Sequence, residues 1–159
     1  MKNFKIVPLS ERYAKKIRDK GIDDFENPVV EQLATGLGPC RVSLKPFNKN
    51  IDRRLLFMHS PFQIHNAFNQ PGPVFIQAEE VVEYQDVYRF PEQIKADKQN
   101  FPLTLVGYNS NQMMVFTQLV GEADVDELIV EIFENQPEVA YLHARNAEAC
   151  CYICKIERL

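Results

Sequence analysis

The chain lacks the features that mark a membrane protein or a nucleic-acid-binding protein. No uninterrupted apolar run reaches the ~18 residues of a membrane-spanning helix, and Lys and Arg are scattered rather than clustered. The formal net charge is −4 at pH 7, whereas binding to a phosphate backbone requires a basic patch. The first residues also lack the pattern of an export signal. We therefore expect a cytoplasmic protein whose partners include neither membrane nor nucleic acid.

Cofactor loops and metal-ligand sets are not evident either. Gly36-Leu37-Gly38 lacks the Lys-Ser/Thr of a P-loop and the strand–helix context of a dinucleotide-binding turn. Cys151 and Cys154 have the spacing of a redox or zinc pair, but residues three apart on a strand face opposite sides of the sheet. Together with Cys40 and Cys150 they are expected to be reduced thiols, because a domain of this size does not need disulfides. We expect no metal and no cofactor.

The length and the element pattern bound the fold. A chain of 159 residues is near the common size of a single domain, and neither a repeat nor a flexible linker divides it. Predicted strands follow one another in adjacent pairs more often than they alternate with long helices. This pattern favours one globular domain over residues 1–159, of the α+β class, with a mostly antiparallel β-sheet and helices packed on one face.

Cap and turn signals divide the chain into short elements. Ser10 and Gly21 bracket a helix over residues 11–20, and Asp124 begins another with a clear apolar face. Shorter helices are predicted over residues 29–34 and 91–98. Strands are predicted over residues 4–7, 41–45, 53–59, 74–76, 103–108 and 113–120, with hairpins at 41–59 and 103–120. Residues 60–73 form a long loop, a candidate pocket wall or lid.

The last twenty residues form a predicted hairpin that carries most of the candidate chemistry. His143 and Arg145 share one face of its first strand. A connection of two or four residues pairs Arg145 with Cys150 and His143 with Tyr152. A connection of three residues instead places His143 opposite Cys151, since a shift of one residue exchanges the faces of a strand. In that register the imidazole could lower the pKa of the thiol and produce a nucleophile.

Arginine offers a different chemistry at the same place. Arg41 and Arg145 on neighbouring strands could clamp a carboxylate or phosphate in bidentate fashion, or both could be solvated edge charges. In the plainest alternative, His143 is a hydrogen-bonded, half-buried residue and Arg145 neutralises a carboxylate such as Glu79 or Glu148. Two further histidines carry weaker hypotheses. His59 is interpreted as a satisfied core histidine, and His65 in the long loop is a second functional candidate.

Three segments carry a resemblance to a known family. They are Gly38-Pro39-Cys40-Arg41, the stretch from Pro71 to Ile76, and the stretch from Val139 to Ala147 with Cys151, in which His-x-Arg-Asn-Ala is the most specific string. Together they resemble the bacterial family called domain of unknown function 1203, over nearly the whole chain. In that family the position of Gln77 is often His and that of Cys150 often Gly. The resemblance implies a one-domain bacterial protein with a candidate site at the hairpin, and no assigned reaction.

Three hypotheses of function follow. In the first, the domain binds a small anionic or polar ligand through Arg145, His143 and Arg41, with Tyr152, Phe62 or Phe68 as walls. In the second, it is a small thiol-dependent enzyme with Cys151 or Cys40 as nucleophile and His143 as base. In the third, it is a non-catalytic interaction subunit with an exposed sheet edge, which predicts a homo-oligomer or a co-purifying protein.

Overall fold

The structure is a computed structural model that describes residues 2–159. Within this range the chain forms eight strands and three helices. The strands are β1 (Phe4–Val7), β2 (Val30–Leu33), β3 (Arg53–His59), β4 (Gly72–Gln77), β5 (Leu103–Tyr108), β6 (Met114–Leu119), β7 (Tyr141–Asn146) and β8 (Tyr152–Arg158). The helices are α1 (Glu11–Lys20), α2 (Glu92–Lys95) and α3 (Val125–Asn135). Helix α2 is shorter than the predicted helix over residues 91–98.

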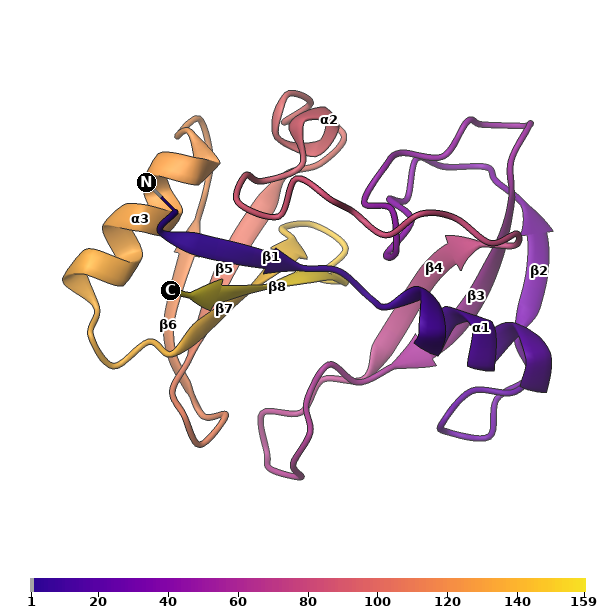
Figure 1. The fold of residues 1–159 in the computed structure, drawn as a ribbon, viewed down its shortest axis with the longest axis horizontal. Helices are drawn as coiled ribbons and strands as arrows, with labels where there is room; N and C mark the ends of the chain where they lie inside the picture. The colour runs from indigo at the N-terminus through magenta and orange to yellow at the C-terminus, as the bar shows by residue number, and fades with distance from the viewer. Residues whose placement is uncertain (1) are drawn as a thin grey trace.

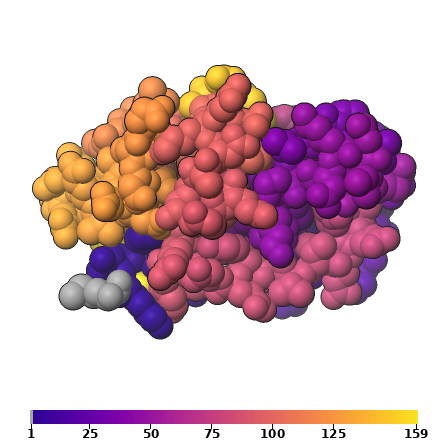
Figure 2. Space-filling model, turned by 90° about the horizontal axis from the view of Figure 1, so that it is seen from above, coloured from indigo at the N-terminus to yellow at the C-terminus, as the bar shows by residue number. Residues whose placement is uncertain are grey.

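The strands form two antiparallel sheets that lie side by side (Figure 1). The five-stranded sheet has the order β1-β8-β7-β5-β6, and the three-stranded sheet has the order β2-β3-β4. Each sheet has its own apolar core and its own helix: α3 packs on the larger sheet and α1 on the smaller one. From above, residues 30–60 form a lobe beside the C-terminal half (Figure 2). The predicted α+β class and antiparallel pairing are confirmed, with two sheets in place of one.

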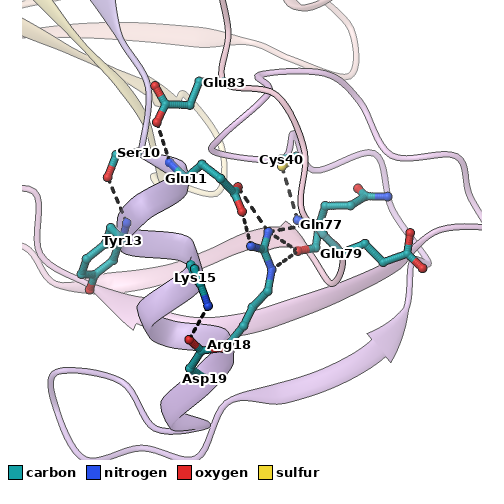
Figure 3. Close-up of polar contacts among 10 residues, drawn as sticks. All are labelled: Ser10, Glu11, Tyr13, Lys15, Arg18, Asp19, Cys40, Gln77, Glu79 and Glu83. Atoms are coloured by element: carbon teal, nitrogen blue, oxygen red, sulfur yellow. Dashed lines mark hydrogen bonds and ion pairs between the residues drawn. The ribbon is translucent and has the colours of Figure 1, made fainter.

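Helix α1 is held at both ends by contacts that its sequence predicts and by one that it does not. The Ser10 hydroxyl accepts a hydrogen bond from the Tyr13 amide at 3.1 Å, and Gly21 ends the helix with φ of 64°. Arg18, which also pairs with Glu11, donates to the main-chain carbonyls of Gln77 and Glu79, the latter at 2.8 Å (Figure 3). This arginine therefore fastens α1 to the end of β4.

Helix α3 is held by hydrogen bonds at both of its ends. The Asp124 carboxylate accepts a hydrogen bond from the Glu127 amide at 3.0 Å, as the cap pattern predicts. At the other end, Arg158 of β8 donates to the carbonyls of Gln136 at 2.8 Å and Val139 at 2.7 Å, and to that of Phe133. These bonds join the last strand to the last helix. None of the described helices is long and apolar enough to cross a membrane.

Two predicted elements are wrong. Residues 29–34 contain strand β2, not a helix, because pairing of Val30 with Leu56 of β3 outweighs the local cap signal of Asn27-Pro28. Residues 41–45 form a turn, not a strand: the Leu44 amide donates to the Cys40 carbonyl at 2.8 Å, and Leu44 has φ of 55°. The predicted hairpin over 41–59 therefore does not exist, and β3 pairs with β2 and β4.

The turn at 41–45 instead joins the two sheets. The Arg41 amide donates to the Phe75 carbonyl of β4 at 3.0 Å, and its Nε donates to the Tyr152 carbonyl of β8 at 2.7 Å. Nη1 donates to the Pro39 carbonyl. Arg41 is only 4% exposed. Arg41 thus links the two halves of the molecule, each built on one sheet: its amide bonds to β4 of the three-stranded sheet and its side chain to β8 of the five-stranded sheet.

Candidate functional site

The candidate site lies on the face of the five-stranded sheet that α3 does not cover. Leu142 and Ala144 of β7 point into the α3 core. Tyr141, His143 and Arg145 alternate with them and point to the opposite face, as the strand period predicts. The connection between β3 and β4 reaches toward this face (Figure 1) and places Phe62 against it. A segment from one half of the molecule therefore covers side chains of the other.

His143 is enclosed by aromatic rings. Its ring centroid lies 4.8 Å from that of Tyr108, 5.0 Å from Tyr152, 5.2 Å from Phe62 and 5.3 Å from Tyr141. The side chain is fully buried, and neither ring nitrogen has a hydrogen-bond partner among residues 2–159. Burial, followed by the nearby positive charge of Arg145, lowers the pKa of His143 to about 2. The imidazole is therefore neutral at physiological pH.

The register of the hairpin differs from both predicted registers. Arg145 pairs with Tyr152 and His143 with Lys155, because a bulge between Ala144 and Arg145 adds a residue to β8. The connection is stabilised by Asn146, whose side-chain oxygen accepts hydrogen bonds from the amides of Glu148 and Ala149. Tyr152 is still a ring neighbour of His143, but it is not its partner in the ladder. Cys151 lies before the strand begins.

The Cys–His pair of the enzyme hypothesis is not formed. The Cys151 thiol contacts the Ala149 carbonyl at 3.6 Å, and His143 bonds to no sulfur in the described chain. Cys40 is 1% exposed, and its sulfur accepts a hydrogen bond from the Gln77 amide at 3.3 Å (Figure 3). The four cysteines are free thiols, of which Cys40 and Cys154 are buried. Among the described residues, no three His, Cys, Asp or Glu side chains form a metal-binding group.

Arg145 is the most unusual side chain of the site. It is 7% exposed, and its Nη1 donates to the Cys150 carbonyl at 3.0 Å. Nε and Nη2 are buried and have no acceptor within residues 2–159. The expected ion pair with Glu79 or Glu148 is not formed. Because Nε–H and the adjacent Nη2–H point the same way, one whole edge of the guanidinium is free, the edge that a carboxylate binds in bidentate fashion.

The Tyr108 hydroxyl belongs to the same group of unsatisfied polar atoms. It is buried and has no partner in the chain from Lys2 onward. Burial raises the pKa of Tyr108, and both the charge of Arg145 and a side-chain interaction with it oppose that rise. The hydroxyl therefore faces the guanidinium without reaching the geometry of a hydrogen bond. Tyr108, His143 and Arg145 together contribute five buried nitrogen and oxygen atoms without partners. Buried polar groups are nearly always hydrogen-bonded in proteins, so this concentration indicates a place where a ligand or water completes the bonding.

A cavity of ≈ 310 Å³ adjoins Arg145, and we call it the Arg145 cavity. Its walls are residues 70–74 before and within β4, the turn at 149–151, His59 and Tyr152. A second cavity of ≈ 370 Å³, the Lys155 cavity, shares His59 and Tyr152 with the first and also contacts Phe62 and Glu157. The predicted wall residues Tyr152 and Phe62 thus line these cavities.

His59 was expected to be a satisfied core histidine, and that expectation is wrong. Its Nδ1 is buried without a partner in the described structure, and its ring lies 6.0 Å from that of Tyr152. Burial is the main reason that its pKa falls to about 4. Sequence reasoning also missed Tyr108, because its meeting with Arg145 depends on the pairing of β5 with β7. His65 lines a further pocket with Ile64 and Asn69, which shares Pro71 with the Arg145 cavity and Phe62 with the Lys155 cavity.

Arg41 does not join Arg145 in a clamp, nor is it a solvated edge charge. Its donors are used by the carbonyls of Pro39 and Tyr152. Burial lowers its pKa to about 10, so the side chain keeps its charge at neutral pH. Both predicted roles of Arg41 are therefore replaced by a structural one. Of the predicted ligand-binding residues, Arg145 and Tyr152 line the cavity itself, and His143 lies beside them.

The sequence can now be placed among known proteins. Residues 38–158 match the sequence profile of a family described as protein of unknown function (DUF1203). The chain belongs to the DUF1203 family. No curated protein and no solved structure matches it. The match contains the three segments on which the resemblance was based, so it includes Arg41, His143 and Arg145.

The DUF1203 match also includes two positions at which backbone conformation favours glycine. Gly38 has φ of 83°, and a Cβ there would lie 2.5 Å from the ring of Phe47. Cys150 has φ of 65° in the turn that follows β7. This left-handed conformation suits glycine, in agreement with the glycine that the resemblance implies at that position.

Proposed function

We propose that the protein binds a small anion at the Arg145 cavity, with Arg145 as the charged donor. The observation that carries the proposal is the buried guanidinium edge, whose Nε and Nη2 have no acceptor in residues 2–159. An uncompensated charge in a desolvated place costs several kcal/mol of folding free energy. A bound anion would offset that cost. The unpaired edge of Arg145 is therefore more typical of a binding site without its ligand than of a structural ion pair.

Neighbouring neutral donors support the same proposal. His143 is uncharged, so it offers one N–H donor and one acceptor, and the Tyr108 hydroxyl offers another donor. Donors of this kind strengthen an oxyanion site without adding net charge. Because Nε and Nη2 are shielded from solvent, an anion reaches them only when the connection between β3 and β4, residues 60–71, or the guanidinium itself moves. The long loop predicted from the sequence is thus proposed as the lid of the site.

The test is anion-dependent stabilisation measured by thermal unfolding at constant ionic strength, with acetate, benzoate and inorganic phosphate as probes. A ligand that binds only the folded state stabilises it by mass action, so at least one probe should raise the melting temperature in a saturable way. Arg145→Gln should abolish the shift. Arg145→Lys keeps the charge but loses the bidentate edge, and should weaken binding by about tenfold or more.

Arg53→Gln is the matched control, because Arg53 is an exposed arginine of β3 whose Nε lies 3.2 Å from the Glu31 carboxylate, away from the cavity. It should leave the anion effect unchanged. An equal shift in wild type and Arg145→Gln would overturn the proposal, and so would the absence of a saturable shift with every probe.

A further inference from the structure

We infer that the ligand is a monocarboxylate with an apolar body, and this inference rests on the proposed anion-binding function. The first reason is charge. Arg145 is the only Lys, Arg, Asp or Glu among the described residues that line the Arg145 cavity. The site therefore balances one negative charge. A phosphate monoester carries about −1.5 to −2 at pH 7, and its second charge would be desolvated without a partner.

Zwitterionic ligands such as amino acids are disfavoured for the complementary reason. No carboxylate lines the Arg145 cavity in the part of the chain that the structure describes. The ammonium group of an amino acid bound through its carboxylate would therefore be buried without a counter-charge, which is strongly unfavourable. His59 supplies no counter-charge, because an imidazole is either neutral or positively charged. The same cavity that accepts a carboxylic acid should reject the amino acid of the same shape.

The walls define the body of the ligand. Pro71, Pro73, Val74 and the ring of Tyr152 present mostly apolar surface, with Gln70 and the two thiols of the turn at the edge. The neighbouring Lys155 cavity is different, because it contains Lys155, Glu157, Gln63 and Gln112. A volume of ≈ 310 Å³ equals roughly ten water molecules at about 30 Å³ each. A ligand of about ten non-hydrogen atoms with an aliphatic or aromatic body would fit.

Four ligands that share a phenyl group separate these requirements. They are 3-phenylpropionate, phenylalanine, phenyl phosphate and 3-phenylpropan-1-ol, measured by titration calorimetry with the intact protein at pH 7.5. The first carries one negative charge, the second adds an ammonium group, the third carries additional negative charge, and the fourth is neutral. We expect 3-phenylpropionate to bind at least about tenfold more tightly than each of the others, because each of the others leaves one charged group in the cavity without a partner. Binding should be lost in Arg145→Gln.

Gln70→Glu provides a variant that changes the selectivity without disturbing the core. Gln70 is exposed and lines the Arg145 cavity. The substitution keeps the size of the side chain and adds one negative charge. It should weaken 3-phenylpropionate and strengthen phenylalanine, and so reduce the ratio of their affinities several-fold. A Gln63→Glu variant, at an exposed residue of the Lys155 cavity, should leave that ratio unchanged.

The outcomes separate the inference from the function on which it rests. If phenyl phosphate or phenylalanine binds as tightly as 3-phenylpropionate and requires Arg145, the ligand class is wrong and the anion site stands. If 3-phenylpropionate binds equally well to Arg145→Gln, the inference and its use of this site both fail. If the acetate, benzoate and phosphate probes are also without effect, the proposed function fails as well.

Discussion

Arg41 and Arg145, two of the three buried arginines among the described residues, both adjoin Tyr152 and differ in how their charge is satisfied. Arg41 is 4% exposed and Arg145 is 7% exposed. Arg41 donates to the backbone carbonyls of Pro39 and Tyr152, whereas Arg145 donates to one carbonyl and leaves one edge of its guanidinium without an acceptor. Burial alone therefore does not separate the two arginines. The distribution of acceptors around them does.

The same comparison separates the boundary between the sheets from the cavity beside it. The Tyr152 carbonyl accepts the Arg41 bond that joins the halves. The Tyr152 ring lines the Arg145 cavity and contacts His143. One residue thus serves the fold with its backbone and the candidate site with its side chain. Substitutions at Arg41 and Arg145 should therefore have opposite effects.

Arg41→Met tests the structural side and has the largest expected effect. The substitution removes two hydrogen bonds from a charged donor and leaves two carbonyls unsatisfied, so we expect the free energy of unfolding to fall by about 3–5 kcal/mol. Urea denaturation followed by circular dichroism measures this change. A loss below about 1 kcal/mol would show that Arg41 does not hold the halves together.

The dependence of folding stability on pH tests the candidate site through its histidines. His143 has a pKa of about 2 in the folded protein and about 6.5 when unfolded, so below pH 6.5 the unfolded state binds a proton that the folded state does not. Stability is complete above pH 6.5 and falls as the pH drops toward the folded pKa. His143 faces the charges of Arg145 and Lys155 and is near His59, which all disfavour its protonation.

We expect His143 to cost about 2 kcal/mol of stability between pH 6.5 and pH 5. The measurement is urea denaturation at both pH values for wild type and His143→Asn, and the variant should have the smaller difference. Asp23 cannot produce this slope, because its pKa is lowered from an already acidic value: burial acts to raise it, but backbone hydrogen bonds prevail. An identical slope in wild type and variant would contradict the assignment.

Arg145→Met should have the opposite sign to Arg41→Met. Replacement of an uncompensated buried charge by an apolar side chain is often neutral or stabilising, so we expect the free energy of unfolding to stay constant or rise by up to about 2 kcal/mol. The measurement requires a buffer without carboxylate or phosphate. A loss of more than about 2 kcal/mol would mean that Arg145 is structural in the same way as Arg41.

Cys150→Gly has the smallest expected effect and tests whether the side chain of Cys150 contributes to binding. Cys150 is exposed with φ of 65°, so glycine should relieve backbone strain and raise the free energy of unfolding by about 0.5–1 kcal/mol. The main-chain carbonyl that accepts from Arg145 is retained. Affinity for 3-phenylpropionate should stay within about twofold of wild type by calorimetry, and a large change would show that the thiol takes part in binding.

Parts of the fold with strong local signals were predictable. Helix α1 has its cap at Ser10 and its stop at Gly21, and α3 has its cap at Asp124. Parts whose conformation depends on pairing with distant residues were not predictable. Residues 29–34 carry a helix-start signal, but they form a strand because they pair with β3. Residues 41–45 alternate like a strand, but the chain turns at Leu44 and places Arg41 at the boundary between the sheets.

The candidate site divides in the same way. Alternation along a strand was enough to place His143 and Arg145 on one face of β7. It could not show that a bulge shifts Arg145 opposite Tyr152, that Tyr108 lies beside it, or that Phe62 covers His143. The roles predicted for Cys151 and Cys40 depended on contacts that the structure does not form.

The sequence by itself determined the class of the fold, the capped helices, the family and the face that carries His143 and Arg145, because each depends on neighbours a few residues apart. Tertiary structure alone decided which polar groups are satisfied. An acceptor for a buried arginine can come from a segment far away in the sequence, as the bond of Arg41 to Tyr152 shows. For Arg145 the fold provides a single carbonyl, and the residue lines a cavity; this local shortage of acceptors makes it the candidate binding residue.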